Sequence, residues 1–310
     1  MTIVQEQIQI KEHKEQDLAA TPNEDVAELV FIASCPSTSL KTLEELALHS
    51  NIYVRKAVSL RNDIPGQLLA KLAMDEDCNV RRRVAGNINT PVEALQHLAA
   101  DEDIDVRIRI AQRPNAPVSI LTILEFDEHE EVRWAVAENV NATPDILKRL
   151  ASDEDENIRL ATAENPSTPI EVLSYLAGDE DECVRSAVAE NEKTSPITLN
   201  ILANDCDKYV RAFVASNEST PVSSLERLST DDDWHVRRNL GKNPSTPPDI
   251  LAHLARDVNR NVRKVVARNM DTPRESLQEL ECDKDVHVGR IACSTIDNIY
   301  CISLSGDDVA

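Results

Sequence analysis

Arginines recur at one fixed spacing along this chain, and this pattern is the first feature of the sequence that could bind a ligand. Each follows a valine or isoleucine, and the pairs recur with one constant period: Val54-Arg55, Val80-Arg81, Val106-Arg107, Val132-Arg133, Ile158-Arg159, Val184-Arg185, Val210-Arg211, Val236-Arg237 and Val262-Arg263. Such a row could grip phosphates or carboxylates, because a guanidinium group presents a planar fork of donors. An aspartate precedes most of these arginines at a constant distance in the sequence. The alternative is therefore an Asp–Arg ladder that ties successive turns together, and recurrence in every unit favours this scaffold role.

A second candidate is a basic stretch near the C-terminal end. Between His235 and Met270 there are eight lysines or arginines against two acidic residues, although the whole chain has a net charge of −22. Arginine beside aromatic side chains is favoured at binding hot spots. We therefore predict these binding residues: Tyr209, Phe213, Trp234, His235, Arg238, Lys242, Arg260, Lys264 and Arg268. The alternative is a solvated face with its aromatic residues placed in the junctions between repeats.

Further candidates come from positions that vary while the rest of the pattern repeats. Counted from the valine or isoleucine before the repeated arginine as position zero, these are −2, −1, +2, +3 and +6. Arg82 and Arg83 occupy such positions near the N-terminal end, and Trp134 occupies one in an acidic middle, so all three join the predicted binding residues. The acidic middle comprises Glu130, Glu131, Glu138, Glu154, Glu156, Glu164, Glu180, Glu182 and Glu190.

Catalytic and metal-binding patterns are absent from the sequence. The seven cysteines are irregularly spaced without C-x-x-C, and the seven histidines show no ligand spacing. Glycine is too scarce for most phosphate-binding loops, and no G-x-S-x-G occurs. We expect reduced cysteines, no metal, no cofactor and no enzymatic activity.

The elements that position these residues follow from a 26-residue repeat, for which Ile158 to Cys183 is the type unit. Leucine stands at +15 and +18 in every unit from Val54 to Val262, which predicts one buried face of a helix. Aspartate at −3, such as Asp155, predicts the N-cap of a first helix that buries positions 0 and +4. Asparagine at +7, such as Asn165, is expected to close that helix.

A Thr-Pro pair predicts the start of the second helix. Glutamate follows threonine three positions later where Thr90 precedes Glu93, and again at Thr168 and Thr272. This spacing is that of a capping box with proline at the first helical position. Two short helices and two tight corners thus fit within one period, and single units must stack to bury a core.

These residues carry a family resemblance. The pattern VRxxVAxNPSTPxxxLxxLAxDxD, clearest from Val132 to Asp181, resembles the leucine-rich repeat variant family and, more distantly, HEAT repeats. The resemblance covers about Asp25 to Thr295 and implies an all-α, right-handed α-solenoid of about ten two-helix repeats, with α- and 3₁₀-helices alternating. Founding relatives also carry an N-terminal iron–sulfur cluster. Only Cys35 precedes Cys78 here, so we do not expect that cluster.

The 26-residue repeat also divides the chain into four segments. Residues 1–24 are polar and lack it, which predicts a flexible N-terminal arm, and residues 25–53 form a degenerate capping repeat. Nine regular repeats occupy 54–287, and 288–310 are expected to form a C-terminal capping helix and tail.

Repeat architectures typically offer extended binding surfaces. We therefore predict a non-enzymatic scaffold that binds another protein or peptide along its concave surface, which the first helices line in HEAT-like solenoids. The chain lacks an apolar run long enough to span a membrane and lacks a secretory signal, so a cytoplasmic protein without membrane association is expected. Two alternatives stay open: nucleic-acid binding through the basic stretch, despite the acidic total, and a glycosylase- or lyase-type enzyme.

Overall fold

The fold is known from a computed structural model that describes residues 24–305, in which α-helices of two alternating sets follow one another and no β-strand occurs. The even-numbered helices are α2 (Glu24–Ser34), α4 (Ile52–Ser59), α6 (Cys78–Gly86), α8 (Ile104–Ala111), α10 (Glu130–Glu138), α12 (Glu156–Glu164), α14 (Glu182–Glu190), α16 (Lys208–Ser216), α18 (Trp234–Lys242), α20 (Arg260–Arg268) and α22 (Val286–Ser305). The odd-numbered helices are α3 (Leu40–Leu46), α5 (Gly66–Leu72), α7 (Val92–Leu98), α9 (Val118–Leu124), α11 (Pro144–Leu150), α13 (Ile170–Leu176), α15 (Pro196–Leu202), α17 (Val222–Leu228), α19 (Pro248–Leu254) and α21 (Arg274–Glu281). The predicted all-α solenoid is confirmed.

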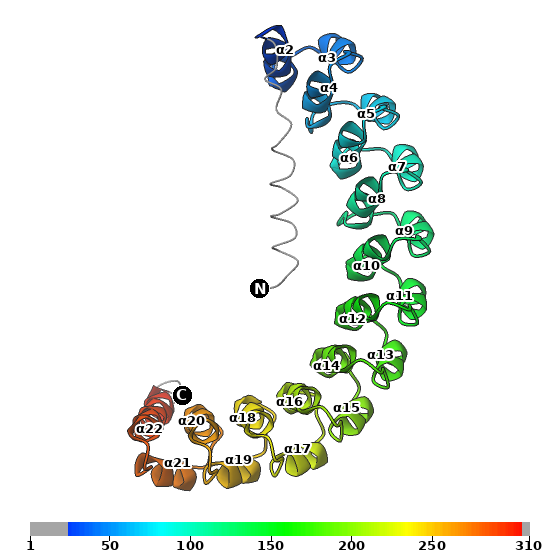
Figure 1. The fold of residues 1–310 in the computed structure, drawn as a ribbon. Helices are drawn as coiled ribbons and strands as arrows, with labels where there is room; N and C mark the ends of the chain where they lie inside the picture. The colour runs from blue at the N-terminus through cyan, green and yellow to red at the C-terminus, as the bar shows by residue number, and fades with distance from the viewer. Residues whose placement is uncertain (1–23, 306–310) are drawn as a thin grey trace. The chain divides into compact units, whose positions relative to one another are not determined.

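The chain forms two compact units, and the boundary between them falls between Leu124 and Glu125. The first contains α2 to α9 and the second contains α10 to α22. Within each unit, consecutive even-numbered helices pack against one another, and each odd-numbered helix contacts its even-numbered neighbours. Figure 1 shows that the even-numbered helices of the second unit follow the inner edge of its curve and the odd-numbered helices its outer edge.

The expected 3₁₀-helices do not occur among the described residues. The odd-numbered helices carry α-type bonds, such as those from the Leu147 amide to the Thr143 carbonyl (3.0 Å) and from the Ala151 amide to the Leu147 carbonyl (2.9 Å). The burial pattern explains this: Ile146, Leu147 and Leu150 are all buried. Their i, i+1, i+4 spacing lies on one face of a helix with 3.6 residues per turn.

Each repeat buries the same few aliphatic side chains, as the register predicts. Leu173 and Leu176, at +15 and +18, are fully buried, and so are Val184 and Val188, at 0 and +4 of the next repeat. In the second unit these layers join into one continuous cluster that reaches from Ala151 to Ala292. At about 2 kcal/mol for each buried aliphatic side chain, a single repeat cannot offset the entropy of ordering its own chain, so the layers stabilise one another.

The asparagine at +7 links neighbouring repeats at the corner after each even-numbered helix. The side-chain amide of Asn191 donates to the Ala163 carbonyl at 2.7 Å, and its oxygen accepts from the Lys193 amide at 3.0 Å. Where arginine replaces this asparagine, its side chain makes the equivalent hydrogen bonds: Arg61 donates to the carbonyls of Ala33 and Cys35 in the preceding repeat. The substitution keeps a donor at the corner, which the buried carbonyls of the preceding repeat require.

The predicted capping box is wrong at Thr90, Thr168 and Thr272. In each case the proline that follows is the N-cap of the short helix and makes no side-chain cap. The three threonines are buried and donate to carbonyls at the end of the preceding even-numbered helix, at 2.6, 2.6 and 2.7 Å. An unpaired carbonyl at a helix end needs a donor, and the hydroxyl supplies it.

Asp at −3 caps the even-numbered helices as predicted: the Asp181 carboxylate accepts from the amides of Cys183 and Val184. At the C-terminal end α22 runs unbroken from Val286 to Ser305. No helix among residues 24–305 combines the length and apolarity that crossing a membrane would need. The predicted arm falls almost wholly outside the described residues.

Candidate binding face

The repeated arginines form a ladder with the repeated aspartates, as the scaffold interpretation predicts. Arg159 donates from Nε and Nη2 to Asp179 at 2.7 and 3.0 Å, while its Nη1 donates to the carbonyls of Asp153 and Glu154. The same pairing recurs in both units: Arg55–Asp75, Arg81–Asp101, Arg133–Asp153, Arg185–Asp205, Arg211–Asp231, Arg237–Asp257 and Arg263–Asp283.

The ladder leaves these arginines little capacity for a ligand. The Arg185 and Asp205 side chains are only 12% and 8% exposed, and each donor nitrogen of Arg185 already has a partner within the chain. Burial alone would raise the pKa of Asp205, but hydrogen bonds from Arg185 and from the Asp207 amide lower it below its ordinary value. The guanidinium row is therefore structural.

Four of the predicted aromatic residues, Tyr209, Phe213, Trp234 and His235, lie on α16 and α18. The rings of Trp234 and His235 stack with centroids 3.8 Å apart, and His235 Nδ1 lies 2.8 Å from Asp233. Phe213 and Trp234 are half-buried and pack against the core of the second unit. Tyr209 is largely exposed, with the Lys208 ammonium 5.2 Å from its ring centre. Two of the four rings therefore contribute to the junctions between repeats.

The predicted basic residues divide into two groups. Arg260 is exposed and pairs with Asp285 at 3.5 Å. Arg238 and Lys242 lie on α18, Lys264 and Arg268 lie on α20, and none of these four has an ion pair or hydrogen bond within residues 24–305. Partial burial and the charge of Arg238 lower the pKa of Lys242. The rise of an α-helix places Arg238 one turn, about 6 Å, along α18 from Trp234, and Lys242 one further turn along, about 12 Å from Trp234.

The remaining predicted residues lie elsewhere. Arg82 and Arg83 are on α6, in the first unit, where Arg82 Nη2 pairs with Asp105 at 2.6 Å and Arg83 is exposed. Trp134 is half-buried on α10, in the second unit. The twelve predicted residues are therefore divided between the two units, and within the second unit Trp134 on α10 is separated from Trp234 on α18 by α12, α14 and α16.

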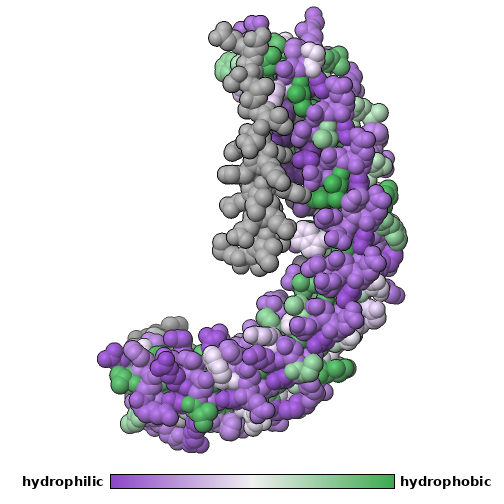
Figure 2. Space-filling model, in the orientation of Figure 1, coloured by the Kyte–Doolittle hydropathy of each residue, from purple (hydrophilic) through white to green (hydrophobic). Residues whose placement is uncertain are grey.

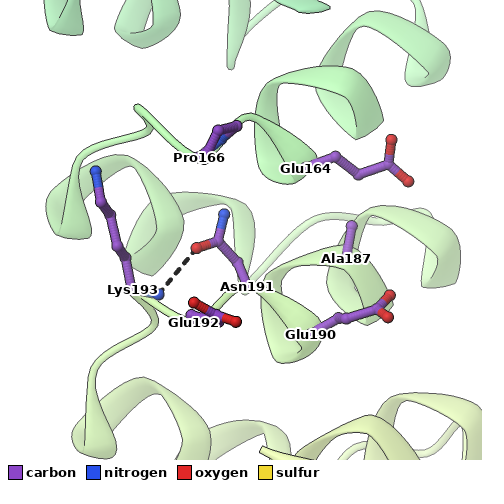
Figure 3. Close-up of a pocket in the computed structure, with 7 residues that line it drawn as sticks. All are labelled: Glu164, Pro166, Ala187, Glu190, Asn191, Glu192 and Lys193. Carbon is purple, nitrogen blue, oxygen red and sulfur yellow. Dashed lines mark hydrogen bonds between the residues drawn. The ribbon is translucent and has the colours of Figure 1, made fainter. Parts of the chain in front are cut away.

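A column of acidic residues completes the inner side of the second unit. Position +6 holds Glu138, Glu164 and Glu190, which are exposed at the ends of α10, α12 and α14. Figure 3 shows Glu164 and Glu190 projecting to the same side, with Ala187 between them. They border a hollow of about 410 Å³ whose other lining residues are Pro166, Asn191, Glu192 and Lys193. The ionisable side chains of this lining are Glu164, Glu190, Glu192 and Lys193.

The environment of these glutamates opposes their ionisation. Partial burial and the neighbouring Glu164 charge raise the pKa of Glu138, and partial burial and Glu190 raise the pKa of Glu164. None of the three carboxylates has an ion-pair partner or hydrogen-bond donor in the described part of the chain. The column was visible in the sequence as part of the acidic middle, but its members were not chosen as site residues.

One buried ion pair was missed by sequence reasoning. The Glu125 side chain is fully buried and accepts from Arg149 at 2.6 and 2.8 Å. Glu125 stands where most repeats have a small residue such as Ala151 or Ala177, and that departure was the available signal. No group of three or more histidine, cysteine, aspartate or glutamate residues suited to a metal occurs among the described residues.

Comparisons with known proteins support the repeat architecture. No family model matches the chain, and no curated protein matches it. Among solved structures, a leucine-rich repeat variant with a novel repetitive structural motif has a TM-score of 0.53 and 27% identity, covering 72% of this chain and 88% of its own. The resemblance seen in the sequence is thus confirmed in three dimensions.

Two more distant solved structures also match the chain. Importin beta has a TM-score of 0.43 and 10% identity, covering 94% of this chain and 53% of its own. Kap121p bound to Ste12p has a TM-score of 0.42 and 12% identity, covering 84% of this chain and 37% of its own.

Proposed function

We propose that this chain is a non-enzymatic scaffold that binds another protein or peptide along the inner face of its second unit. We define the inner face as the exposed and half-buried side chains of α10, α12, α14, α16, α18 and α20. The observation that carries the proposal is the set of uncompensated charges on this face, acidic on α10 to α14 and basic on α18 and α20. Because the described part of the chain supplies no counter-ion for these charges, they can form ion pairs with a bound ligand.

Within each repeat, the residues that bond neighbouring repeats together differ from those that carry charges without an ion pair, and this difference supports the proposed function. The repeated Arg, Asp, Asn and Thr side chains are occupied by bonds that hold repeats together, as Arg185 and Asn191 illustrate. Position +6, in contrast, carries charges that no scaffold bond uses. Figure 2 shows the visible side of the second unit as mostly hydrophilic. On the helices of the inner face, Tyr209 is the one large apolar side chain of the described residues that is exposed. Polar and charged contacts, more than a large apolar patch, therefore fit this surface.

A photo-crosslinking residue tests the proposal at two positions of one repeat. Ser216 is exposed on α16, at +6 on the inner face, and Ser223 is exposed on α17, on the outer side. A benzoylphenylalanine at each position is activated in the cells that make the protein. We expect a discrete protein adduct from position 216 and little from position 223.

Three outcomes would contradict the proposal. Equal adducts from both positions would mean nonspecific contact, and no adduct from either would mean that nothing binds there. An adduct consisting of nucleic acid would favour the nucleic-acid alternative, whose contact would weaken steeply with added salt.

A further inference from the structure

Charges on the inner face are arranged in two blocks of opposite sign. Reading position +6 from α10 to α20 gives Glu138, Glu164, Glu190, Ser216, Lys242 and Arg268. Position −2 repeats the order, with glutamate on α10, α12 and α14, then Lys208 and, after Trp234, Arg260. Three repeats are thus acidic, one is uncharged at +6, and two are basic.

At position −2 the chain pairs Lys208 with Asp233 and Arg260 with Asp285, whereas the charges at position +6 have no ion pair within residues 24–305. In the acidic block the carboxylates of Glu138, Glu164 and Glu190 lie near enough to disfavour ionisation within the column. In the basic block Arg238 disfavours the charged form of Lys242. Like charges cost free energy when they are held together in a partly desolvated position. A ligand that carried the opposite charges would remove this cost in both blocks at once.

The spacing and curvature of the face select the form of such a ligand. Packed helices lie about 8–10 Å apart, so the five steps from Glu138 to Arg268 span about 40–50 Å. An extended chain advances about 10 Å in three residues, which matches one repeat. A straight helix would lose contact with the curved row of even-numbered helices that Figure 1 shows in this unit. At about 3.3 Å per residue, an extended segment of about 16 residues can follow the whole row.

We propose that the inner face binds an extended segment of another protein that has a basic block over α10–α14 and an acidic block over α18 and α20. This inference rests on the proposed function and adds the chemistry of its partner. Lysine or arginine at every third position meets the glutamates, and aspartate or glutamate at the same interval meets Lys242 and Arg268. Ser216 faces the junction between the two blocks.

Two synthetic peptides of equal composition test the charge order. The block peptide is a hexadecapeptide with lysine at positions 1, 4 and 7, glutamate at 13 and 16, and serine or alanine elsewhere. The mixed peptide exchanges one lysine with one glutamate, so that the signs alternate at the same positions. Both have the same net charge and experience the same long-range attraction to an acidic protein. In fluorescence anisotropy at about 50 mM salt, we expect the block peptide to bind at least about tenfold more tightly.

Charge-reversal variants of the protein test whether the acidic and basic residues of the inner face bind the block peptide. We expect E164K/E190K and, separately, K242E/R268E each to weaken binding of the block peptide at least about tenfold. The control E171K/E226K makes the same charge change as the first pair on exposed residues of α13 and α17, and K148E/K284E, also at exposed residues, matches the second pair. We expect less than about a twofold change from either control. Circular dichroism of each variant verifies that the fold is retained.

The outcomes separate this inference from the proposed function. Equal binding of the two peptides, or block-peptide binding that falls as much in the controls, would overturn the charge-order proposal. If crosslinking at position 216 still captures a protein, and E164K/E190K and K242E/R268E leave that capture unchanged, the scaffold function stands and the partner chemistry is wrong. If no protein is captured but the block peptide binds as expected, the face recognises the charge order and the proposed cellular role fails.

Discussion

Replacing Asp205 by asparagine should show how much one rung of the ladder stabilises the second unit. The carboxylate accepts from Arg185 Nε at 2.7 Å, from Nη2 at 3.0 Å and from the Asp207 amide at 2.8 Å. An asparagine keeps one acceptor but turns an NH₂ group toward the guanidinium. It also leaves the Arg185 charge nearly buried without a counter-ion.

The expected cost follows from that geometry. Removing one partner of a buried ion pair typically costs about 3–5 kcal/mol, and the remaining 12% exposure of Arg185 places D205N near the lower end, at about 3 kcal/mol. Urea unfolding followed by circular dichroism measures the change in free energy. Because each rung joins only neighbouring repeats, hydrogen exchange should quicken mainly in α14, α15 and α16.

The matched control is D232N, which removes the same charge from an exposed side chain next to the following rung. We expect it to cost less than about 0.5 kcal/mol. A D205N cost below about 1 kcal/mol, or one equal to that of D232N, would refute the argument, since the rung would then be worth no more than a surface ion pair.

The pH dependence of the D205N effect gives a second check. The pKa of Asp205 is lowered in the folded protein, so its contribution is present above the ordinary carboxyl pKa of 3.8 and is lost as the pH falls through the folded value. The difference between wild type and D205N should therefore be constant from pH 7 to about pH 5 and shrink toward pH 3. An unchanged difference at pH 3 would contradict the assignment.

Three further predictions concern the corner, the buried pair and the acidic column. N191A should cost about 1–3 kcal/mol in urea unfolding, because the Ala163 carbonyl and the Lys193 amide lose their partners. R149A should cost about 3 kcal/mol and E125A about 1 kcal/mol or less, because only the first leaves a buried charge behind, whereas Arg149 is 44% exposed and can turn to water; equal costs would contradict this. E138Q/E164Q should raise the unfolding free energy at pH 7 by less than about 1 kcal/mol, since both glutamates are exposed and screened. Their raised pKa means that wild type should gain stability as the pH falls from 7 toward 5, and the double variant should lack this gain.

The 26-residue register allowed the helices, the Arg–Asp ladder and the buried leucines to be predicted, because each depends on a side chain that recurs at the same position. Thr168 shows where such reasoning fails: a Thr-Pro-x-Glu string fits a capping box, but the carbonyl of Thr162 is the nearer acceptor in the folded corner. The choice between the two depends on the path of the backbone, which local spacing does not contain. Glu125 departs from the small residue that most repeats have at that position, and it pairs with Arg149, whose position varies between repeats. A repeating pattern cannot predict a pair that occurs once.

The candidate site was predictable only in part. Lys242 and Arg268 were chosen from the local excess of positive charge. Their side chains have no ion pair within residues 24–305, and their role in binding stays a prediction. Glu138, Glu164 and Glu190 were not chosen, because acidic residues are common in a chain with a net charge of −22. They stand out only once the structure shows that they form a column. Trp234 was chosen as an aromatic anchor, yet part of its ring is used in the core.

The scaffold bonds have a consequence for how such a chain can change over generations. Each spans a constant sequence separation: 20 residues for an Arg–Asp pair, and 28 for the bond between a corner asparagine and its alanine carbonyl. Duplicating or deleting one whole repeat would therefore restore every bond across the new junction with an equivalent partner. Gene-level gain or loss of whole repeats could lengthen or shorten the interval between the acidic and basic blocks without a new fold. A gain or loss that falls one position short of a whole repeat would shift the partners of every bond that crosses the new junction out of register, so this architecture favours length variation in whole repeats.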